Sequence, residues 1–234
     1  MTKAIRAHQA GGADVLRWED VEVPAPAKGQ IRVRHTAVGL NYIDVYQRSG
    51  LYPMQYPVVL GMEGAGTVTA VGPGVRDFKT GDRVAYTGAM GSYSEERLMP
   101  ADKAVKLPDG IDDRTGAAIM LKGTTAEYLL RRTYKVKKGQ TILVHAAAGG
   151  VGLILCQWAK HLGCTVIGTV GSDDKAKLAK AHGCDHTIVY TRENFAKRVR
   201  ELTDGKGVPV VYDAVGKDTW EGSLDSLSPL GMMV

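Results

Sequence analysis

Five apolar runs recur at a near-constant interval in the second half of the chain, and this spacing constrains the fold more than any other feature. The runs are centred near Leu143, Ile167, Ile188, Val210 and Met232, which lie 24, 21, 22 and 22 residues apart. A helical pattern fills each gap, over 151–161, 174–182, 193–202 and 218–227. Strands that alternate with helices at this interval predict βαβ units and a doubly wound parallel sheet, as in a Rossmann domain. The last run ends with the chain at Val234, so we expect a truncated form of a longer protein.

The first half has a different pattern, in which short β-branched runs are separated by turns rich in Gly and Pro. Examples are the runs at 31–34 and 66–71 and the turns at 71–74 and 108–110. Many short strands with such turns indicate a β-barrel or sandwich. A chain of 234 residues can hold two modest domains, and we predict them at residues 1–120 and 121–234.

A helix start is predicted near the junction of these halves. Thr124-Thr125-Ala126-Glu127 matches the capping box, in which a Thr side chain and a Glu three residues later satisfy backbone N–H groups. The pattern predicts a helix that opens there and ends among Arg131, Arg132 and Lys135, where cations suit the helix dipole.

Composition narrows the classes of protein. Hydrophobic residues make up 44% and charged residues 24%, which is typical of globular chains and excludes a disordered one. The three cysteines form no C-x-x-C pair, so we expect a reducing, cytoplasmic location. The stretch 139–159 has no charged residue, but glycines and polar residues interrupt it, so we predict a buried strand, turn and helix and no membrane partner. A net charge of +5 suits anionic ligands and permits weak RNA binding.

A glycine-rich turn indicates dinucleotide binding. The strand at 141–145 is followed by Ala-Ala-Ala-Gly-Gly-Val-Gly at 146–152, which departs from G-x-G-x-x-G only by Ala147 at the first glycine. We expect Gly149 and Gly150 to let the backbone approach a pyrophosphate, and Gly152 to let helix and strand pack closely. The alternative is a turn with a structural role only.

The end of the next strand favours NADPH over NADH. An NAD site usually has an acidic residue there to bind the ribose hydroxyls, but the strand at 165–170 ends without one. It continues into Gly171 and Ser172, with Lys175 three residues on. Ser172 can donate to a 2′-phosphate and Lys175 can neutralise it. Asp173 and Asp174 argue against this, unless they serve the first turn of the next helix.

Four separated motifs together resemble one known family. They are Gly61 to Gly72, Gly81 to Val84, Asn41 to Asp44 and the glycine turn. The chain resembles the zinc-free, zeta-crystallin-like quinone oxidoreductases of the medium-chain dehydrogenase/reductase superfamily. The resemblance implies a GroES-like barrel followed by a truncated Rossmann domain. It also implies a homodimer at full length and NADPH-dependent reduction of a quinone or another small electrophile.

The resemblance also implies the site residues. It places Asn41, Tyr46 and Tyr52 at the catalytic site, although Tyr52 could instead pack at the barrel edge. The cofactor-binding residues that it implies are Asn41, Tyr42, Ile43, Thr125, Tyr128, Gly149, Gly150, Val151, Gly171, Ser172, Lys175, Tyr190 and Val215. Asn41 and Met62 stand where the zinc branch has Cys and His ligands, so we expect no zinc requirement.

Two alternatives stay open at this point. One is an NADPH-dependent enone or enoyl reductase, which uses the same cofactor on a conjugated alkene. The other is a nucleic-acid-binding or crystallin-like role, which the branch includes.

Overall fold

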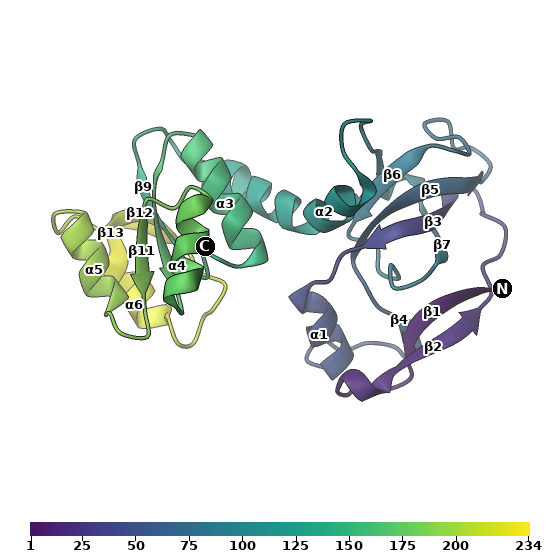
Figure 1. The fold of residues 1–234 in the computed structure, drawn as a ribbon, viewed down its shortest axis with the longest axis horizontal. Coiled ribbons are helices and arrows are strands. Elements are labelled where there is room, and N and C mark those ends of the chain that lie inside the picture. The colour runs from purple at the N-terminus through teal and green to yellow at the C-terminus, as the bar shows by residue number, and fades with distance from the viewer. The chain divides into compact units, whose positions relative to one another are not determined.

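The computed structural model describes residues 1–234, and its internal contacts divide the chain into two compact units, Met1–Leu121 and Lys122–Val234. Strands dominate the first unit, whereas strands and helices alternate in the second (Figure 1).

The first unit is built from two antiparallel sheets. One has the strand order β2-β1-β4, and the other has the order β7-β3-β5-β6-β8. One α-helix, α1, follows the long strand β3, and the first part of a second helix, α2 (Asp113–Tyr128), also belongs to this unit. The elements are β1 (Thr2–Ala7), β2 (Leu16–Val21), β3 (Gln30–Val38), α1 (Tyr42–Ser49), β4 (Val58–Val59), β5 (Glu63–Val71), β6 (Arg83–Thr87), β7 (Glu96–Pro100) and β8 (Ala104–Lys106), with 3-10 turns at Ala13–Val15 and Ala101–Lys103.

Alternating side chains form the core of this unit. Ile31 and Val33 on β3 are fully buried, whereas Arg34 is exposed, as expected for a strand with one face on the core. Gly66 on β5 allows two strands to approach, because a β-carbon there would lie 2.0 Å from the carbonyl oxygen of Arg34. The β-rich architecture predicted for the first half is confirmed.

The helix α2 (Asp113–Tyr128) shows that the predicted helix start is wrong. Thr124–Glu127 lie in the last turns of α2, which continues as a π-helical turn over Leu129–Thr133. The helix begins instead after Asp112, whose carboxylate accepts from the backbone N–H of Thr115 at 2.7 Å. Because Asp112 satisfies this N-terminal donor, the capping-box pattern twelve residues later has no capping role.

The second unit is a parallel five-stranded sheet with the order β11-β10-β9-β12-β13. Its strands are those predicted from the spacing of the apolar runs, and a helix precedes or follows each of them. The elements are β9 (Thr141–Val144), α3 (Gly150–His161), β10 (Thr165–Val170), α4 (Asp173–Ala181), β11 (His186–Val189), α5 (Phe195–Leu202), β12 (Val208–Tyr212), α6 (Trp220–Ser226) and β13 (Leu227–Met233). The predicted doubly wound parallel sheet is therefore confirmed.

Helices cover both faces of this sheet. One core cluster joins Val144 and Val166 to α3 and α4, and the other joins Leu143 and Ile167 to Val199 of α5. Strands buried on both faces need apolar side chains at nearly every position, which is why they appear as continuous apolar runs in the sequence.

The three cysteines are free thiols, and each is buried. The exposed fractions of their side chains are 0% for Cys156, 3% for Cys164 and 4% for Cys184. The uncharged stretch 139–159 forms β9, the glycine turn and most of α3. No helix in the structure has both the length and the apolar character needed to cross a membrane.

Candidate cofactor-binding site

The glycine turn lies between β9 and α3 and closes tightly on itself. The N–H of Gly149 donates to the carbonyl of Ala146 at 2.8 Å, and Gly149 is the N-cap of α3. A β-carbon at Gly152 would lie 2.3 Å from the same carbonyl oxygen, so only glycine fits there. The prediction for Gly152 is close packing of helix and strand, and the atoms that a β-carbon there would meet belong to Ala146 and Ala147, in the turn that joins β9 to α3.

Gly150 differs from Gly152 in what surrounds it. A β-carbon at Gly150 would meet only the Cδ and Cε atoms of Lys122, at 3.0 Å, and this flexible side chain can move. Gly150 is the first residue of α3 and does not have a positive φ. Glycine at this position is therefore not required by the fold itself, and a ligand at the helix N-terminus would explain it.

A pocket of about 350 Å³ lies beside this turn, at the carboxyl ends of the parallel strands. The strand order changes direction at β9 and β12, and ligands of doubly wound sheets bind at such a switch point. The lining residues come from the ends of β9, β10 and β11, from the first turns of α4 and α5, and from the loop after β12: His145, Ala146, Ala148, Gly149, Thr169, Val170, Gly171, Lys175, Tyr190, Phe195, Val215, Asp218 and Thr219.

The structure brings five of the predicted cofactor residues together in this pocket. They are Gly149, Gly171, Lys175, Tyr190 and Val215. A β-carbon at Gly171 would lie 2.9 Å from the hydroxyl oxygen of Tyr190, so glycine lets this ring approach the end of β10. Gly149 and Gly171 thus leave backbone open to a ligand.

Gly150, Val151 and Ser172 adjoin the lining residues in sequence. The hydroxyl of Ser172 caps α4 by accepting from the N–H of Lys175 at 3.4 Å, which leaves the hydroxyl hydrogen for a ligand. Asp173 and Asp174 lie in the first turn of α4, where acids suit the dipole. The donors and the positive charge beside this pocket fit the 2′-phosphate of NADPH.

A buried histidine beneath the pocket was not predicted. His145 lines the pocket, and its Nδ1 lies 2.8 Å from the Thr169 hydroxyl and its Nε2 3.0 Å from the Ser223 hydroxyl. Ser223 in turn donates to the carboxylate of Asp213 at 2.7 Å. Because Ser223 gives its hydrogen to Asp213, it accepts from Nε2–H, and Nδ1 then accepts from Thr169. Burial lowers the pKa of His145, which favours this neutral form.

Asp213 fixes the loop after β12 that lines the same pocket. Its carboxylate also accepts from the N–H groups of Val215 and Gly216 and from the hydroxyl of Thr219. Burial alone would raise the pKa of Asp213, but these hydrogen bonds lower it below its ordinary value, so the carboxylate is ionised at neutral pH. The partners are far apart in sequence, and no local motif signals them.

We expect Ser223→Ala to destabilise the second unit, because it leaves a buried Nε2–H without an acceptor. The expected loss in the free energy of unfolding is about 1–3 kcal/mol. Ser226→Ala is the matched control, since Ser226 is also fully buried on α6 but donates only to Gly222 of its own helix. Urea unfolding of both variants measures this difference, and equal losses would show that the His145 network contributes nothing.

In the first unit, Asn41 is held by a buried carboxylate. Its Nδ2 donates to Oε1 of Glu63 at 2.8 Å, and the other oxygen of Glu63 accepts from the N–H of Leu121 at 2.7 Å. Glu63 is fully buried. The N–H of Asn41 donates to Asp44, which also accepts from the hydroxyl of Tyr93 at 2.7 Å. Sequence reasoning missed Glu63 and Asp44 as the residues that orient Asn41.

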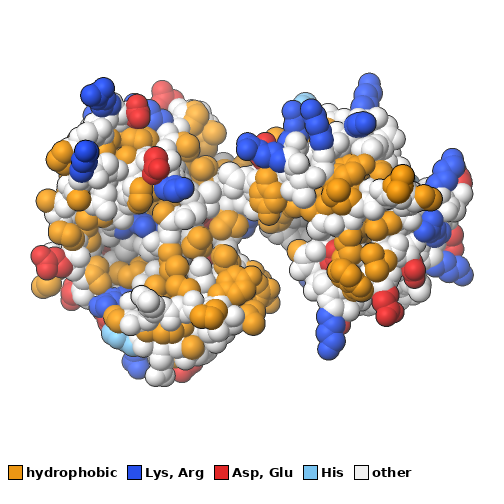
Figure 2. All heavy atoms as spheres, turned by 180° about the vertical axis from the view of Figure 1, so that it is seen from behind, with side chains coloured by type: hydrophobic (Ala, Val, Ile, Leu, Met, Phe, Trp, Pro, Cys, Tyr) orange, Lys and Arg blue, Asp and Glu red, His pale blue; other side chains and the backbone are white.

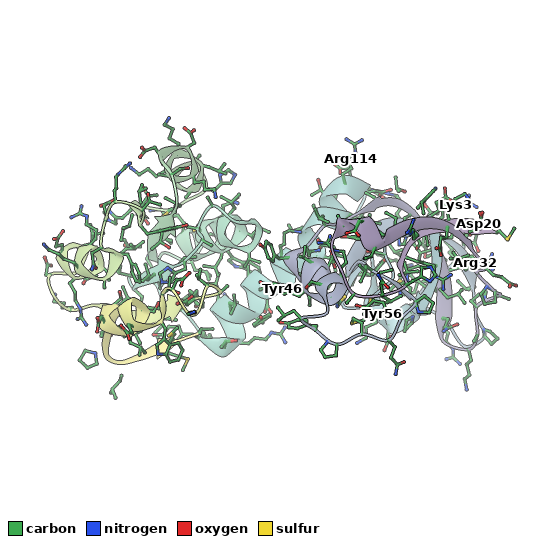
Figure 3. The ribbon with its side chains drawn as sticks, turned by 90° about the horizontal axis from the view of Figure 1, so that it is seen from below. Lys3, Asp20, Arg32, Tyr46, Tyr56 and Arg114 are labelled. Atoms are coloured by element: carbon green, nitrogen blue, oxygen red, sulfur yellow. The ribbon has the colours of Figure 1, made fainter.

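The predicted tyrosines lie on α1 and just after it, and each ring packs against the next. The ring centroids of Tyr42 and Tyr46 are 5.3 Å apart, and those of Tyr46 and Tyr52 are 5.5 Å apart. Tyr42 is 74% exposed and Tyr52 47%, so both keep surface available to a ligand. The Tyr56 hydroxyl donates to the carbonyl of Gln47 and secures the end of α1 near Tyr46 (Figure 3). The Tyr52 ring packs on Tyr46 and is partly exposed, and its place at the catalytic site rather than in barrel-edge packing stays a prediction.

The remaining predicted residues lie on α1 and α2. Ile43 is half-buried on α1, Thr125 is half-buried on α2, and Tyr128 is 46% exposed at the end of α2. None of these three lines the pocket of the second unit. Their role toward a cofactor therefore stays a prediction.

The residues at the expected zinc positions are poor zinc ligands. Asn41 carries a neutral amide bonded to Glu63, and the sulfur of Met62 lies 3.6 Å from Nε2 of Gln47. Zinc sites use thiolate, imidazole or carboxylate groups, and no group of three or more such side chains is placed to hold a metal ion.

Comparisons with known proteins agree with this geometry. Residues 27–109 match the alcohol dehydrogenase GroES-like domain, and residues 150–234 match the zinc-binding dehydrogenase domain. A GroES-like unit followed by a parallel nucleotide-binding unit defines a medium-chain dehydrogenase/reductase.

Within that superfamily, the chain belongs to the quinone oxidoreductase family. It is 57% identical over 236 residues to a quinone oxidoreductase of Pseudomonas aeruginosa, covering 100% of this chain and 73% of the relative. It is 51% identical to a 2-haloacrylate reductase of a Burkholderia species, covering 99% of this chain and 72% of the relative. The crystal structure of Escherichia coli quinone oxidoreductase complexed with NADPH matches with a TM-score of 0.96 and 49% identity, over 99% of this chain and 72% of the other.

Proposed function

We propose that this protein is an NADPH-dependent quinone oxidoreductase that reduces a quinone without zinc. The observation that carries the proposal is the pocket beside the glycine turn, where Lys175 and Tyr190 meet an open backbone and no acidic residue ends β10. The 49% identical Escherichia coli structure, described as complexed with NADPH, supports the same cofactor.

The second unit offers a distinct group for each part of the cofactor. Backbone N–H groups at the start of α3, around Gly149, Gly150 and Val151, would hold the pyrophosphate. Ser172 and Lys175 would hold the 2′-phosphate, with Tyr190 and Val215 against the adenosine. Phe195, another lining residue that was not predicted, packs edge-to-face on His145.

Residues of the first unit and of α2 take the remaining proposed roles. Asn41, Tyr42 and Ile43, with Thr125 and Tyr128, are assigned to the nicotinamide side, and Tyr46 and Tyr52 to the substrate. Bound NADPH supplies the hydride. A quinone is already electron-poor, so its reduction needs hydrogen-bond donors for the product oxygens rather than a metal Lewis acid. The Asn41 amide and the tyrosine hydroxyls are such donors, and Glu63 fixes the amide in one orientation.

We expect NADPH-dependent turnover of 1,4-benzoquinone that is unchanged after the protein has been treated with a chelator. The physical reason is that neither Asn41 nor Met62 can replace a thiolate or imidazole ligand. The measurement is the rate of loss of NADPH absorbance, with elemental analysis of the same sample. One bound zinc per chain, together with loss of activity on its removal, would overturn the zinc-free assignment.

A conjugated-alkene reductase is the second candidate, and one observation favours it. The Burkholderia relative, 51% identical over nearly the whole chain, is a 2-haloacrylate reductase. The same assay distinguishes the two functions when 2-chloroacrylate replaces the quinone. A higher kcat/KM for 2-chloroacrylate would favour the alkene reductase.

Assembly and location stay predictions. The homodimer, weak RNA binding and a cytoplasmic location were expected from the resemblance and the composition. On the face shown in Figure 2, Lys and Arg side chains are scattered over both units among Asp and Glu. A scattered positive charge favours weak, salt-sensitive binding of RNA over a defined RNA site.

A further inference from the structure

An acidic residue lies next to the group proposed to bind the 2′-phosphate, and it needs an explanation. Asp173 directly follows Ser172 and precedes Lys175 by two positions in the first turn of α4. Hydrogen bonds from Arg192 hold the pKa of Asp173 below its ordinary value, so the carboxylate is ionised at neutral pH. A carboxylate at the end of the second strand of such a sheet is the feature that selects NADH, because it binds ribose hydroxyls and repels a phosphate.

Asp173 is engaged by a single arginine from another element. Arg192 donates from Nη1 and Nη2 to the two carboxylate oxygens, at 2.9 and 2.5 Å, in a two-pronged pair. It comes from the turn after β11, two residues beyond the pocket-lining Tyr190. Figure 1 shows α4 beside β11, so this pair joins two elements that border the pocket.

We propose that Arg192 determines cofactor selectivity by holding and neutralising Asp173, so that the end of β10 accepts a 2′-phosphate. This inference rests on the proposed function, in which the pocket binds NADPH. Without Arg192, the carboxylate of Asp173 is free to accept from the 2′- and 3′-hydroxyls of NADH and opposes the charge of NADPH. The chain thus carries an acid three residues beyond the end of β10, in the first turn of α4, and the arginine cancels its effect.

The exposure of the pair argues against a mainly structural role. The side chains of Arg192 and Asp173 are 58% and 64% exposed, and exposed ion pairs contribute little to folding stability. Asp174 provides a contrast, because it is 92% exposed and pairs with Lys177 on its own helix. None of these four residues lines the pocket itself, but only Asp173 directly adjoins Ser172. Loss of the Asp174–Lys177 pair should therefore change cofactor binding little.

The test is a titration of the Arg192→Gln variant with NADPH and with NADH at low salt, in which the fluorescence of the cofactor is measured. We expect the Kd for NADPH to rise about five- to twentyfold, because the carboxylate of Asp173 is then uncompensated. The rise is limited to this range because solvent and salt screen an exposed charge. The Kd for NADH should stay the same or fall. Adding Asp173→Asn to Arg192→Gln should restore most of the NADPH affinity, because the uncompensated carboxylate is gone. Lys177→Gln is the matched control and should change both Kd values far less, because Lys177 acts on Asp173 only through a smaller charge interaction.

The outcomes separate this inference from the proposed function. A parent protein that binds neither cofactor would contradict the proposed function. If the parent binds NADPH but Arg192→Gln leaves the ratio of the two Kd values unchanged, the selectivity role of Arg192 is wrong. If adding Asp173→Asn fails to restore NADPH binding, the selectivity role proposed for Arg192 is also wrong. Arg192 would then bind the phosphate directly and would not act by neutralising Asp173. A melting curve of each variant confirms that the comparison is made on folded protein.

Discussion

Lys175→Ala is expected to weaken NADPH binding about ten- to a hundredfold and to leave NADH binding nearly unchanged. Lys175 lines the pocket at the start of α4, and a charge-assisted contact to a phosphate contributes about 1.5–3 kcal/mol. NADH lacks the 2′-phosphate, so it has no such contact to lose. Fluorescence titration with both cofactors measures the two affinities.

Lys177→Ala is the control for this experiment. Lys177 lies on the same helix, carries the same charge and does not line the pocket. Its loss removes an exposed pair with Asp174 and a smaller charge interaction with Asp173. Equal losses of NADPH and NADH affinity in Lys175→Ala would show that Lys175 does not contact the 2′-phosphate.

Gly150→Val is expected to abolish NADPH and NADH binding while the protein stays folded. The new side chain would stand at the N-terminus of α3, where the backbone N–H groups are assigned to the pyrophosphate. Backbone strain contributes little here, because Gly150 has no positive φ and its neighbour Lys122 is flexible. The melting temperature should therefore fall little.

Gly152→Ala tests the opposite combination. Its β-carbon would meet the carbonyl oxygen of Ala146 at 2.3 Å, so the turn must shift and stability should fall by about 1–3 kcal/mol. A melting curve and an NADPH titration on each variant separate the two glycines. Wild-type affinity in folded Gly150→Val protein would mean that the turn does not bind the cofactor, and the proposed function would lose its main support.

The parallel sheet could be predicted because burial on both faces imposes a signal along the chain. Each strand needs a continuous apolar run, and each crossover helix adds a near-constant length. The pocket residues Gly149, Gly171 and Lys175 could be predicted for a related reason, since they follow strand ends that the same pattern locates.

The start of α2 could not be predicted, because two glycines interrupt it. Gly116 and Gly123 lie inside the helix, where glycine usually counts against helix formation. A β-carbon at Gly116 would lie 2.9 Å from the side chain of Leu107. Packing against this residue, which lies outside the helix, therefore favours glycine at position 116. Local propensity carries no information on such a contact.

Except for Asp44, which is three residues from Asn41, the orienting residues escaped prediction because their partners are remote in sequence. His145 meets Thr169 across 24 positions and Ser223 across 78, and Asn41 meets Glu63 across 22. Surface pairs between neighbouring strands, such as Lys3 with Asp20, are equally non-local (Figure 3). Only the folded chain reveals these pairs.

The burial of every native thiol makes this chain a convenient host for site-specific labels. Cys156, Cys164 and Cys184 lie in the core of the second unit, and buried thiols react slowly with maleimides. A single cysteine introduced at an exposed position such as Lys177 could thus carry a fluorophore with no removal of native cysteines. Such a dye, placed on α4 near the pocket but outside it, would report cofactor binding in real time.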